Sequence, residues 1–146
     1  MQITTRDFGD IEIKETEIIL FQEGIPGFEE HTKYVMIKNA DEELPFHWLQ
    51  SIENPQLAFI VMNPFIFKKD YDFSIPKTVV DKLGIKGYEN VDIYTIVNIP
   101  EDFNQMTANL LAPVIINPES GLGKQLLLEG TQYRTKHLIV AEINQP

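Results

Sequence analysis

Side chains that could support catalysis or bind a metal are few in this sequence, and they are widely spaced. The three histidines, His31, His47 and His137, show no spacing typical of a metal site. His47 stands between two aromatic residues, where a structural histidine is a more frequent role than a general base paired with a carboxylate. None of the three serines lies in a Gly-x-Ser-x-Gly elbow, and the chain has no cysteine. We therefore expect no enzymatic activity, no metal and no cofactor.

The segment from Gly121 to Gln125 resembles a phosphate-binding loop only in part. Such a loop has a glycine five positions before Gly123, where this chain has Pro118. It also has a serine or threonine after the lysine, where this chain has Gln125. We therefore expect a hairpin turn at this segment.

Two pairs of carboxylates, Asp70 with Asp72 and Glu101 with Asp102, each lie beside aromatic side chains. Acid–base catalysis would require a pocket that drives the pKa values of the two carboxyl groups apart, and the sequence indicates none. A solvated loop is the more frequent setting for such a pair. Where aromatic residues accompany negative charge, a protein interface is indicated, because the anchors supply binding energy and the charges supply steering and specificity.

The composition is that of a small acidic protein. The 146 residues, 43% of them hydrophobic, suit a single domain over 1–146 with its own core. The formal net charge is −10, and residues 1–53 hold 12 acidic against four basic side chains. Such a field repels nucleic acid and favours a basic partner, although an acidic surface can also serve solubility alone. With neither a signal sequence nor an apolar run near the roughly 20 residues of a membrane span, we expect a cytoplasmic protein.

The elements that would position these side chains are mostly short strands. The stretch over 45–64 carries the longest apolar run, and its Asn-Pro turns delimit strands at 46–51 and 57–62, which we expect at the centre of the core. The apolar pattern takes a helical period over 76–83, where Gly84 would end the helix. Further strands are predicted at 11–14, 17–21, 34–37, 91–99 and 125–128, with two more strand segments meeting at a bend within 109–118.

This succession of short strands predicts a mainly β fold. We expect a small antiparallel β-barrel or barrel-like sandwich, with one short helix near 76–83 that covers an open end. Near the C-terminus, residues 138–140 are predicted to form an edge strand, or residues 134–146 form a mobile tail.

Four segments resemble the flagellar assembly factor FliW, a bacterial protein family. They are FQEGIPGFE at 21–29, FHWLQS at 46–51, PQLAFIV at 55–61 and TANLLAPVIIN at 107–117. The segments follow one another in the family's order, and the resemblance extends over residues 1–135 or so. Their order makes the resemblance specific, whereas any one segment alone is weak.

The resemblance implies a non-enzymatic β-barrel that binds two proteins in the cytoplasm: flagellin, the filament subunit, and CsrA, a small basic RNA-binding dimer that represses flagellin translation. Flagellin binds the factor until the flagellin itself is exported. The freed factor then binds CsrA away from its RNA-binding surface and allosterically weakens its grip on mRNA. We expect the free chain to be a monomer. The alternative is a small-molecule-binding barrel or a hydrolase built on His47 and a carboxylate, which predicts a ligand-sized cavity in the barrel.

The segments that carry the resemblance look mainly structural, so we place the partner-binding residues in three loops instead. One loop is the turn after the strand at 46–51, and the other two hold the carboxylate pairs beside aromatic residues. The candidate partner-binding residues are Glu53, Asn54, Asp70, Tyr71, Asp72, Glu101, Asp102 and Phe103.

Overall fold

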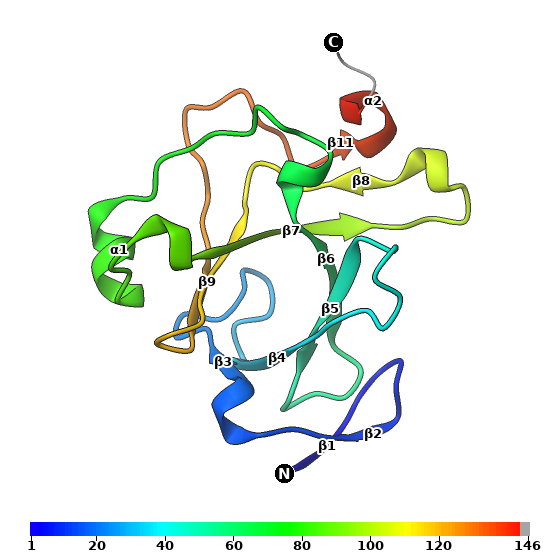
Figure 1. The fold of residues 1–146 in the computed structure, drawn as a ribbon, viewed down its shortest axis with the longest axis vertical. Helices are drawn as coiled ribbons and strands as arrows, with labels where there is room; N and C mark the ends of the chain where they lie inside the picture. Colours follow the sequence, from blue (N-terminus) through cyan, green and yellow to red (C-terminus); the bar gives the residue numbers. More distant parts are fainter. Residues whose placement is uncertain (144–146) are drawn as a thin grey trace.

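A computed structural model describes residues 1–143 and shows a mainly β protein with a closed barrel at its centre (Figure 1). The elements are β1 (Gln2–Thr4), β2 (Asp10–Glu12), η1 (Glu15–Glu17), β3 (Ile18–Leu20), β4 (Lys33–Ile37), β5 (Phe46–Ser51), β6 (Ala58–Met62), η2 (Pro64–Ile66), α1 (Lys77–Leu83), η3 (Tyr88–Asn90), β7 (Asp92–Asn98), η4 (Phe103–Gln105), β8 (Thr107–Ala108), β9 (Val114–Asn117), β10 (Leu122–Gln125), β11 (His137–Leu138) and α2 (Ile139–Ile143). Residues 144–146, the end of the predicted tail, lie outside the described part of the chain.

Seven strands close into the barrel, in the order β7-β6-β5-β4-β3-β10-β9, and β9 pairs back with β7. Each neighbouring pair is antiparallel except β3 and β10, which run parallel where Leu20 meets Leu122. An odd number of strands cannot alternate in direction around a closed ring, so one parallel pair is required. The predicted barrel is therefore confirmed, with the correction that it is not wholly antiparallel.

Two apolar clusters make up most of the core. One draws side chains from six of the barrel strands, among them Tyr34, Leu49 and Val61, and so fills the interior of the ring. The other lies between the barrel and the segments that cover it, and it includes Leu83 of α1 and Ile139 of α2. Strands β6 and β9 have almost continuously apolar sequences because both of their faces contact a cluster.

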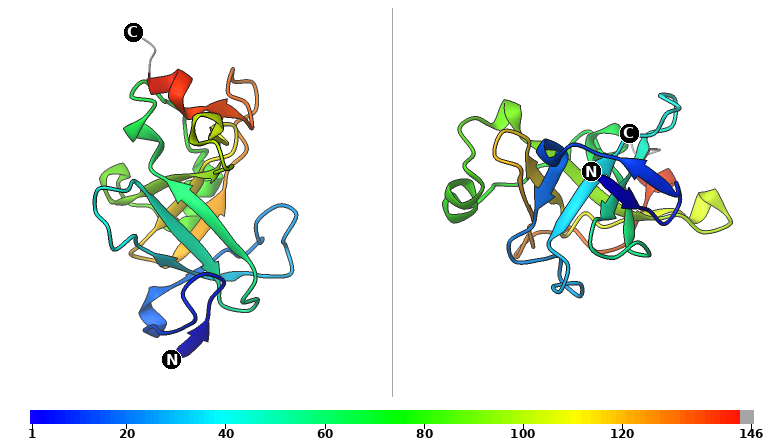
Figure 2. Two further views of the ribbon diagram at one scale, coloured as in Figure 1. Left: turned by 90° about the vertical axis from the view of Figure 1, so that its right-hand side faces the viewer. Right: turned by 90° about the horizontal axis from the view of Figure 1, so that it is seen from below.

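The central stretch lies where the sequence predicts it. Strand β5 has the predicted bounds and β6 starts one residue later, and the two pair in the register Trp48 with Ile60. Trp48 itself is only half-buried. It lies on the barrel face that the β1–β2 ribbon covers in part. Its ring meets Phe8 of the ribbon edge-on, with the centroids 4.7 Å apart. Figure 2 shows this ribbon at one end of the molecule and α2 at the other.

Helix α1 confirms the predicted helix. Pro76 is its N-cap residue, and Gly84 ends it in the left-handed conformation with φ of 67°, which a glycine adopts without steric cost. Val79 and Leu83 are buried on one face of the helix, as their spacing predicts.

The C-terminal part of the chain differs from the prediction. Strand β10 covers Leu122–Gln125 instead of 125–128, and Gly123 within it lies against the ring of Phe21, where any Cβ would clash. The tail forms the two-residue strand β11, antiparallel to β8, followed by α2. The predicted edge strand at 138–140 is thus right for Leu138 alone, because Ile139 and Val140 belong to α2, a second helix that the sequence pattern did not indicate.

Candidate functional site

The eight residues predicted to bind partners do not form one surface. Glu53 and Asn54 lie in the β5–β6 turn, toward the end of the barrel that carries the β1–β2 ribbon (Figure 1). Residues 70–72 and 101–103 lie toward the opposite end, on either side of α2 (Figure 1). Lys68 pairs with Glu142 of α2 on one side, and η4 contacts α2 on the other.

Glu53 caps the start of β4. Its Oε1 atom accepts hydrogen bonds from the backbone N–H groups of Thr32 and Lys33, at 2.7 and 3.0 Å. These two hydrogen bonds lower the pKa of Glu53, with the larger effect from Lys33 and the smaller from Thr32. The carboxylate thus has a structural role, whether or not a partner also contacts it.

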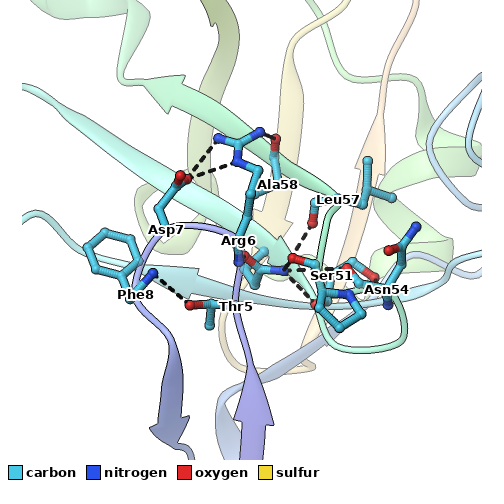
Figure 3. A network of polar contacts seen from close by, with 10 residues as sticks. Thr5, Arg6, Asp7, Phe8, Ser51, Asn54, Leu57 and Ala58 are labelled. Atoms are coloured by element: carbon cyan, nitrogen blue, oxygen red, sulfur yellow. Dashed lines mark hydrogen bonds and ion pairs between the residues drawn. The ribbon is translucent and has the colours of Figure 1, made fainter.

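The β5–β6 turn is held from inside by Gln50, which is 1% exposed. Its amide nitrogen faces the backbone carbonyl groups of Ser51 and Leu57 at 3.0 and 3.2 Å, and its carbonyl oxygen accepts the N–H of Arg6 at 3.0 Å. Figure 3 shows the Arg6 side chain reaching from the ribbon to the backbone carbonyl of Ala58, 2.8 Å away. The β1–β2 ribbon is therefore attached to the barrel at this turn by hydrogen bonds.

Tyr71 is a core residue, which corrects its prediction as an exposed anchor. Its side chain is 3% exposed, and its hydroxyl donates a 2.6 Å hydrogen bond to the backbone carbonyl of Leu110. Burial raises the pKa of Tyr71, and the neighbouring Tyr133 adds a smaller effect in the same direction. The alternation over residues 70–75 explains this placement, because residues 71, 73 and 75 face the core while 70, 72 and 74 face solvent.

Asp70 and Asp72 are exposed, as predicted. Asp70 pairs with Lys68 at 3.1 Å, and this pairing lowers the pKa of Asp70. The same ammonium group lies 2.9 Å from Glu142, so Lys68 connects the loop to α2. The backbone N–H of Asp72 donates to the hydroxyl of Tyr133 at 3.1 Å, while its carboxylate faces solvent.

The loop before β8 also keeps its predicted exposure. Phe103 is 62% exposed at the start of η4. The Asp102 side chain caps this short helix by accepting the N–H of Asn104 at 3.0 Å. Glu101 is exposed beside it. This loop presents an aromatic side chain next to negative charge, separately from residues 70–72.

The structure also has an exposed apolar projection at η2, which is not among the eight predicted residues. Asn63 caps η2 by accepting the N–H of Phe65 at 2.9 Å, and the buried Pro64 and Phe67 fix the segment to the core. The side chains between these anchors point outward, so Phe65 is 40% and Ile66 54% exposed. In the sequence, the signal for this projection is the pair of apolar residues directly after the Asn63-Pro64 turn.

Three hollows meet at this projection. One, of about 590 Å³, lies between η2, the loop before β5 and the start of β7, and we name it the Lys38 cavity after the lysine in its wall. A second, of about 460 Å³, runs from Phe65 to Tyr88, and a third, also of about 460 Å³, separates Ile66 from the end of α2. An exposed projection surrounded by hollows is the shape that an apolar anchor residue of a partner can fit.

We name the whole area the η2 surface. Its apolar members are exposed and line the hollows: Leu44, Phe65, Ile66 and Tyr88. Its rim carries three exposed carboxylates: Glu42, Asp72 and Asp92. Of the eight predicted residues, Tyr71 and Asp72 line the second hollow of this surface and Asp70 lines the third.

His47 lines the Lys38 cavity without the geometry of a hydrolytic site. Its Nδ1 atom accepts the backbone N–H of Asn39 at 3.0 Å, so this nitrogen cannot also hold a proton for a carboxylate. Burial, followed by the charge of Lys38, lowers the pKa of His47. Within residues 1–143, no group of three or more His, Asp or Glu side chains could hold a metal ion. Neither described helix has the length and hydrophobicity that crossing a bilayer requires.

Comparison with known proteins places the chain in a family. The family model described as "FliW protein" matches residues 2–139. The flagellar assembly factor FliW of Alkaliphilus metalliredigens is 52% identical over 145 residues, which cover 99% of this chain and 90% of the relative. The factor of the same name from Bacillus subtilis is 43% identical, with 97% and 99% of the two chains covered. A crystal structure of the flagellar assembly factor FliW superposes with a TM-score of 0.89 at 39% identity, and covers 95% of this chain and 96% of that chain. By the extent of these matches, the chain belongs to the FliW family.

Proposed function

We propose that this chain is a flagellar assembly factor that acts by binding two proteins in the cytoplasm. It binds flagellin and, when released, binds the translational repressor CsrA and allosterically antagonises its RNA binding, which relieves repression of flagellin translation. The observation that carries this proposal is the similarity over nearly the whole chain to proteins named flagellar assembly factor FliW. On this proposal the chain works by occupying surfaces of other proteins and not by chemistry.

We place the docking of CsrA at the η2 surface. Phe65 and Ile66 would enter the partner's surface as apolar anchors, since a few side chains that become tightly packed and desolvated supply most of the binding energy in protein interfaces. The carboxylates of Glu42, Asp72 and Asp92 would attract a basic dimer and orient it. The net charge of −10 extends this attraction over the whole molecule.

The η4 loop remains a candidate contact on the far side of α2. Phe103 could serve as a second anchor there, with Glu101 and Asp102 as steering charges. We assign this loop to no single partner, and the free chain is proposed to be a monomer.

A small-molecule-binding barrel receives less support. The ring is filled by side chains such as Leu49, Val61 and Val114, which have no exposed surface. The hollows around η2 lie outside the ring, between its strands and the loops that cover them.

Calorimetric titration with purified CsrA and purified flagellin tests the proposal. We expect CsrA to bind with an affinity that falls as salt rises, because exposed opposite charges are screened. Flagellin added first should prevent CsrA from binding. Absence of heat and of co-migration with both proteins, at low salt and with the folded chain, would overturn the proposal.

A further inference from the structure

The Lys38 cavity contains an unusual group of hydrogen-bond donors for so acidic a protein. Lys38 follows β4, His47 lies in β5 and Tyr94 lies in β7, and all three line the cavity. The Lys38 ammonium donates a 2.6 Å hydrogen bond to the hydroxyl of Tyr94. The rings of His47 and Tyr94 lie perpendicular to each other, with their centroids 6.4 Å apart. Three strands thus bring the three polar groups into one hollow.

Each of the three groups retains a proton that it can donate. An ammonium group has three N–H bonds, and Lys38 uses one of them on Tyr94. The Tyr94 hydroxyl accepts that bond and keeps its own proton. The Nδ1 atom of His47 accepts from the backbone, so in the neutral imidazole the proton is on Nε2, the opposite side of the ring. The three residues that line the cavity can therefore each donate a hydrogen bond, one from a cationic group and two from neutral groups.

We infer that the Lys38 cavity binds a carboxylate group that a docked protein partner supplies, with Lys38, Tyr94 and His47 as its hydrogen-bond donors. This inference rests on the proposed function, because the cavity forms part of the η2 surface, and it names a specific recognition event within that docking. We assign the carboxylate to the partner's chain terminus rather than to an Asp or Glu side chain, because apolar residues also line the cavity. The carboxylates of the rim can attract a basic partner, but they cannot bind a carboxylate of that partner.

The charges around the cavity favour a monoanion over a phosphate. Lys38 is the cation among the donors, while the exposed Glu42 and Asp92 also line the hollow. A dianionic phosphate would meet two carboxylates for one ammonium, and the net charge of −10 would repel it further. A carboxylate carries one charge and accepts several donors at once, which matches the set present.

The remaining walls are apolar and suit the group attached to the carboxylate. Leu44, Pro45, Phe65 and Ile93 surround the polar groups. An aliphatic side chain next to the carboxylate could therefore contact them and lose its hydration at the same time. We expect a chain terminus with an apolar last residue to fit best.

Nuclear magnetic resonance titration of the full chain with N-acetyl-L-leucine tests this inference without any partner protein. N-acetyl-L-leucine amide is the matched neutral probe, acetate represents a side-chain carboxylate, and inorganic phosphate is the competing anion. We expect saturable shifts of the His47 and Tyr94 ring signals with N-acetyl-L-leucine, weaker ones with acetate, and none with the amide. Larger effects of acetate than of N-acetyl-L-leucine would overturn the assignment to a chain terminus. Equal effects of the amide, or stronger binding of phosphate, would overturn the carboxylate assignment.

Two variants separate the site from a general loss of charge. Lys38→Met should weaken N-acetyl-L-leucine binding roughly tenfold, since a hydrogen bond to a charged group is lost. Lys86→Met, which removes an exposed lysine outside the cavity, should leave it unchanged. Equal affinities of the two variants would overturn the role of Lys38. Because this assay contains no CsrA, a failure of CsrA to bind would affect the proposed function and not the cavity's selectivity.

Discussion

The hydroxyl of Tyr71 donates a hydrogen bond of 2.6 Å to the backbone carbonyl of Leu110, and so ties the segment after η2 to the bend between β8 and β9. Both residues are buried in the cluster that covers the barrel. Tyr71 thus supports, from the core, the loop in which Asp70 and Asp72 face solvent. This relationship separates the residues that shape the proposed docking surface from those that touch a partner.

Tyr71→Phe should therefore destabilise the fold without weakening partner binding. The Leu110 carbonyl would lose its donor, and we expect the free energy of unfolding to fall by about 1 to 2 kcal/mol in urea denaturation. Tyr88→Phe is the control, since Tyr88 is exposed and its change should stay within about 0.5 kcal/mol. A Tyr71→Phe chain of normal stability but reduced CsrA affinity would restore Tyr71 as an anchor.

Gln50→Leu should be more damaging, because this one side chain serves both the β5–β6 turn and the N-terminal ribbon. Buried carbonyl groups and the N–H of Arg6 would lose their partner, and we expect a loss of about 2 to 3 kcal/mol in the free energy of unfolding. Gln105→Leu, at an exposed position, should have little effect. A loss below about 1 kcal/mol for Gln50→Leu would mean that the turn does not depend on this network.

Ile66→Asp should abolish most of the CsrA affinity while the barrel stays folded. The side chain is exposed, so stability should change little, but a charge would replace an apolar anchor, and we expect at least a tenfold increase in Kd by calorimetry. Leu127→Asp is the matched control, because Leu127 is exposed to a similar extent and lines none of the hollows around η2. Equal effects of the two substitutions would remove η2 from the interface.

Charge reversal at Asp70 and Asp72 together should slow association with CsrA. Attraction between opposite charges acts mainly on the association rate, so we expect a several-fold reduction at low salt that vanishes at high salt. Thermal unfolding should show that the double variant is folded. Reversal of Glu119 and Glu129, both exposed, makes the same change of net charge elsewhere. Unchanged CsrA and flagellin affinities for the Asp70 and Asp72 variant would exclude both residues from the interface.

Glu23 should contribute stability that depends on pH. Hydrogen bonds with Lys124 and then Lys82 lower its pKa from 4.5 to about 2. A carboxyl group whose pKa is lowered by folding stabilises the folded state above about pH 4.5, and this stabilisation is lost as the pH falls toward 2. Because Glu23 is half-exposed, we expect less than about 1 kcal/mol.

Glu23→Gln tests this dependence by urea denaturation at pH 7 and pH 3. The difference in stability from the unmodified chain should be present at pH 7 and smaller at pH 3. Glu119→Gln, with an exposed carboxylate, is the control. A difference that grows as the pH falls would contradict the assigned sign.

The local structure could largely be predicted from the sequence, because local signals determine it. Asn-Pro steps delimit β5 and β6, and Gly84 ends α1 where its freedom to adopt positive φ is needed. The alternation over residues 70–75 accounts for the exposure of Asp70 and Asp72, and the same alternation buries Tyr71.

Contacts between distant segments could not be predicted in this way. The parallel pairing of Leu20 with Leu122 and the contact of Gly123 with the Phe21 side chain depend on how the barrel closes. The η2 surface is likewise assembled from η2, the loop before β5 and the start of β7. The hydrophobic periodicity of a single segment does not indicate which distant segments it contacts.

The single parallel pair of the barrel also has a consequence for synthesis of the chain. Until residues near Leu122 have left the ribosome, β3 has no neighbour on one side and exposes unpaired N–H and C=O groups. Such an edge invites association between nascent chains. The 12 acidic side chains among residues 1–53 lie in the same part of the sequence as β3, so we expect the acidity that would attract a basic partner also to make unfinished chains repel one another.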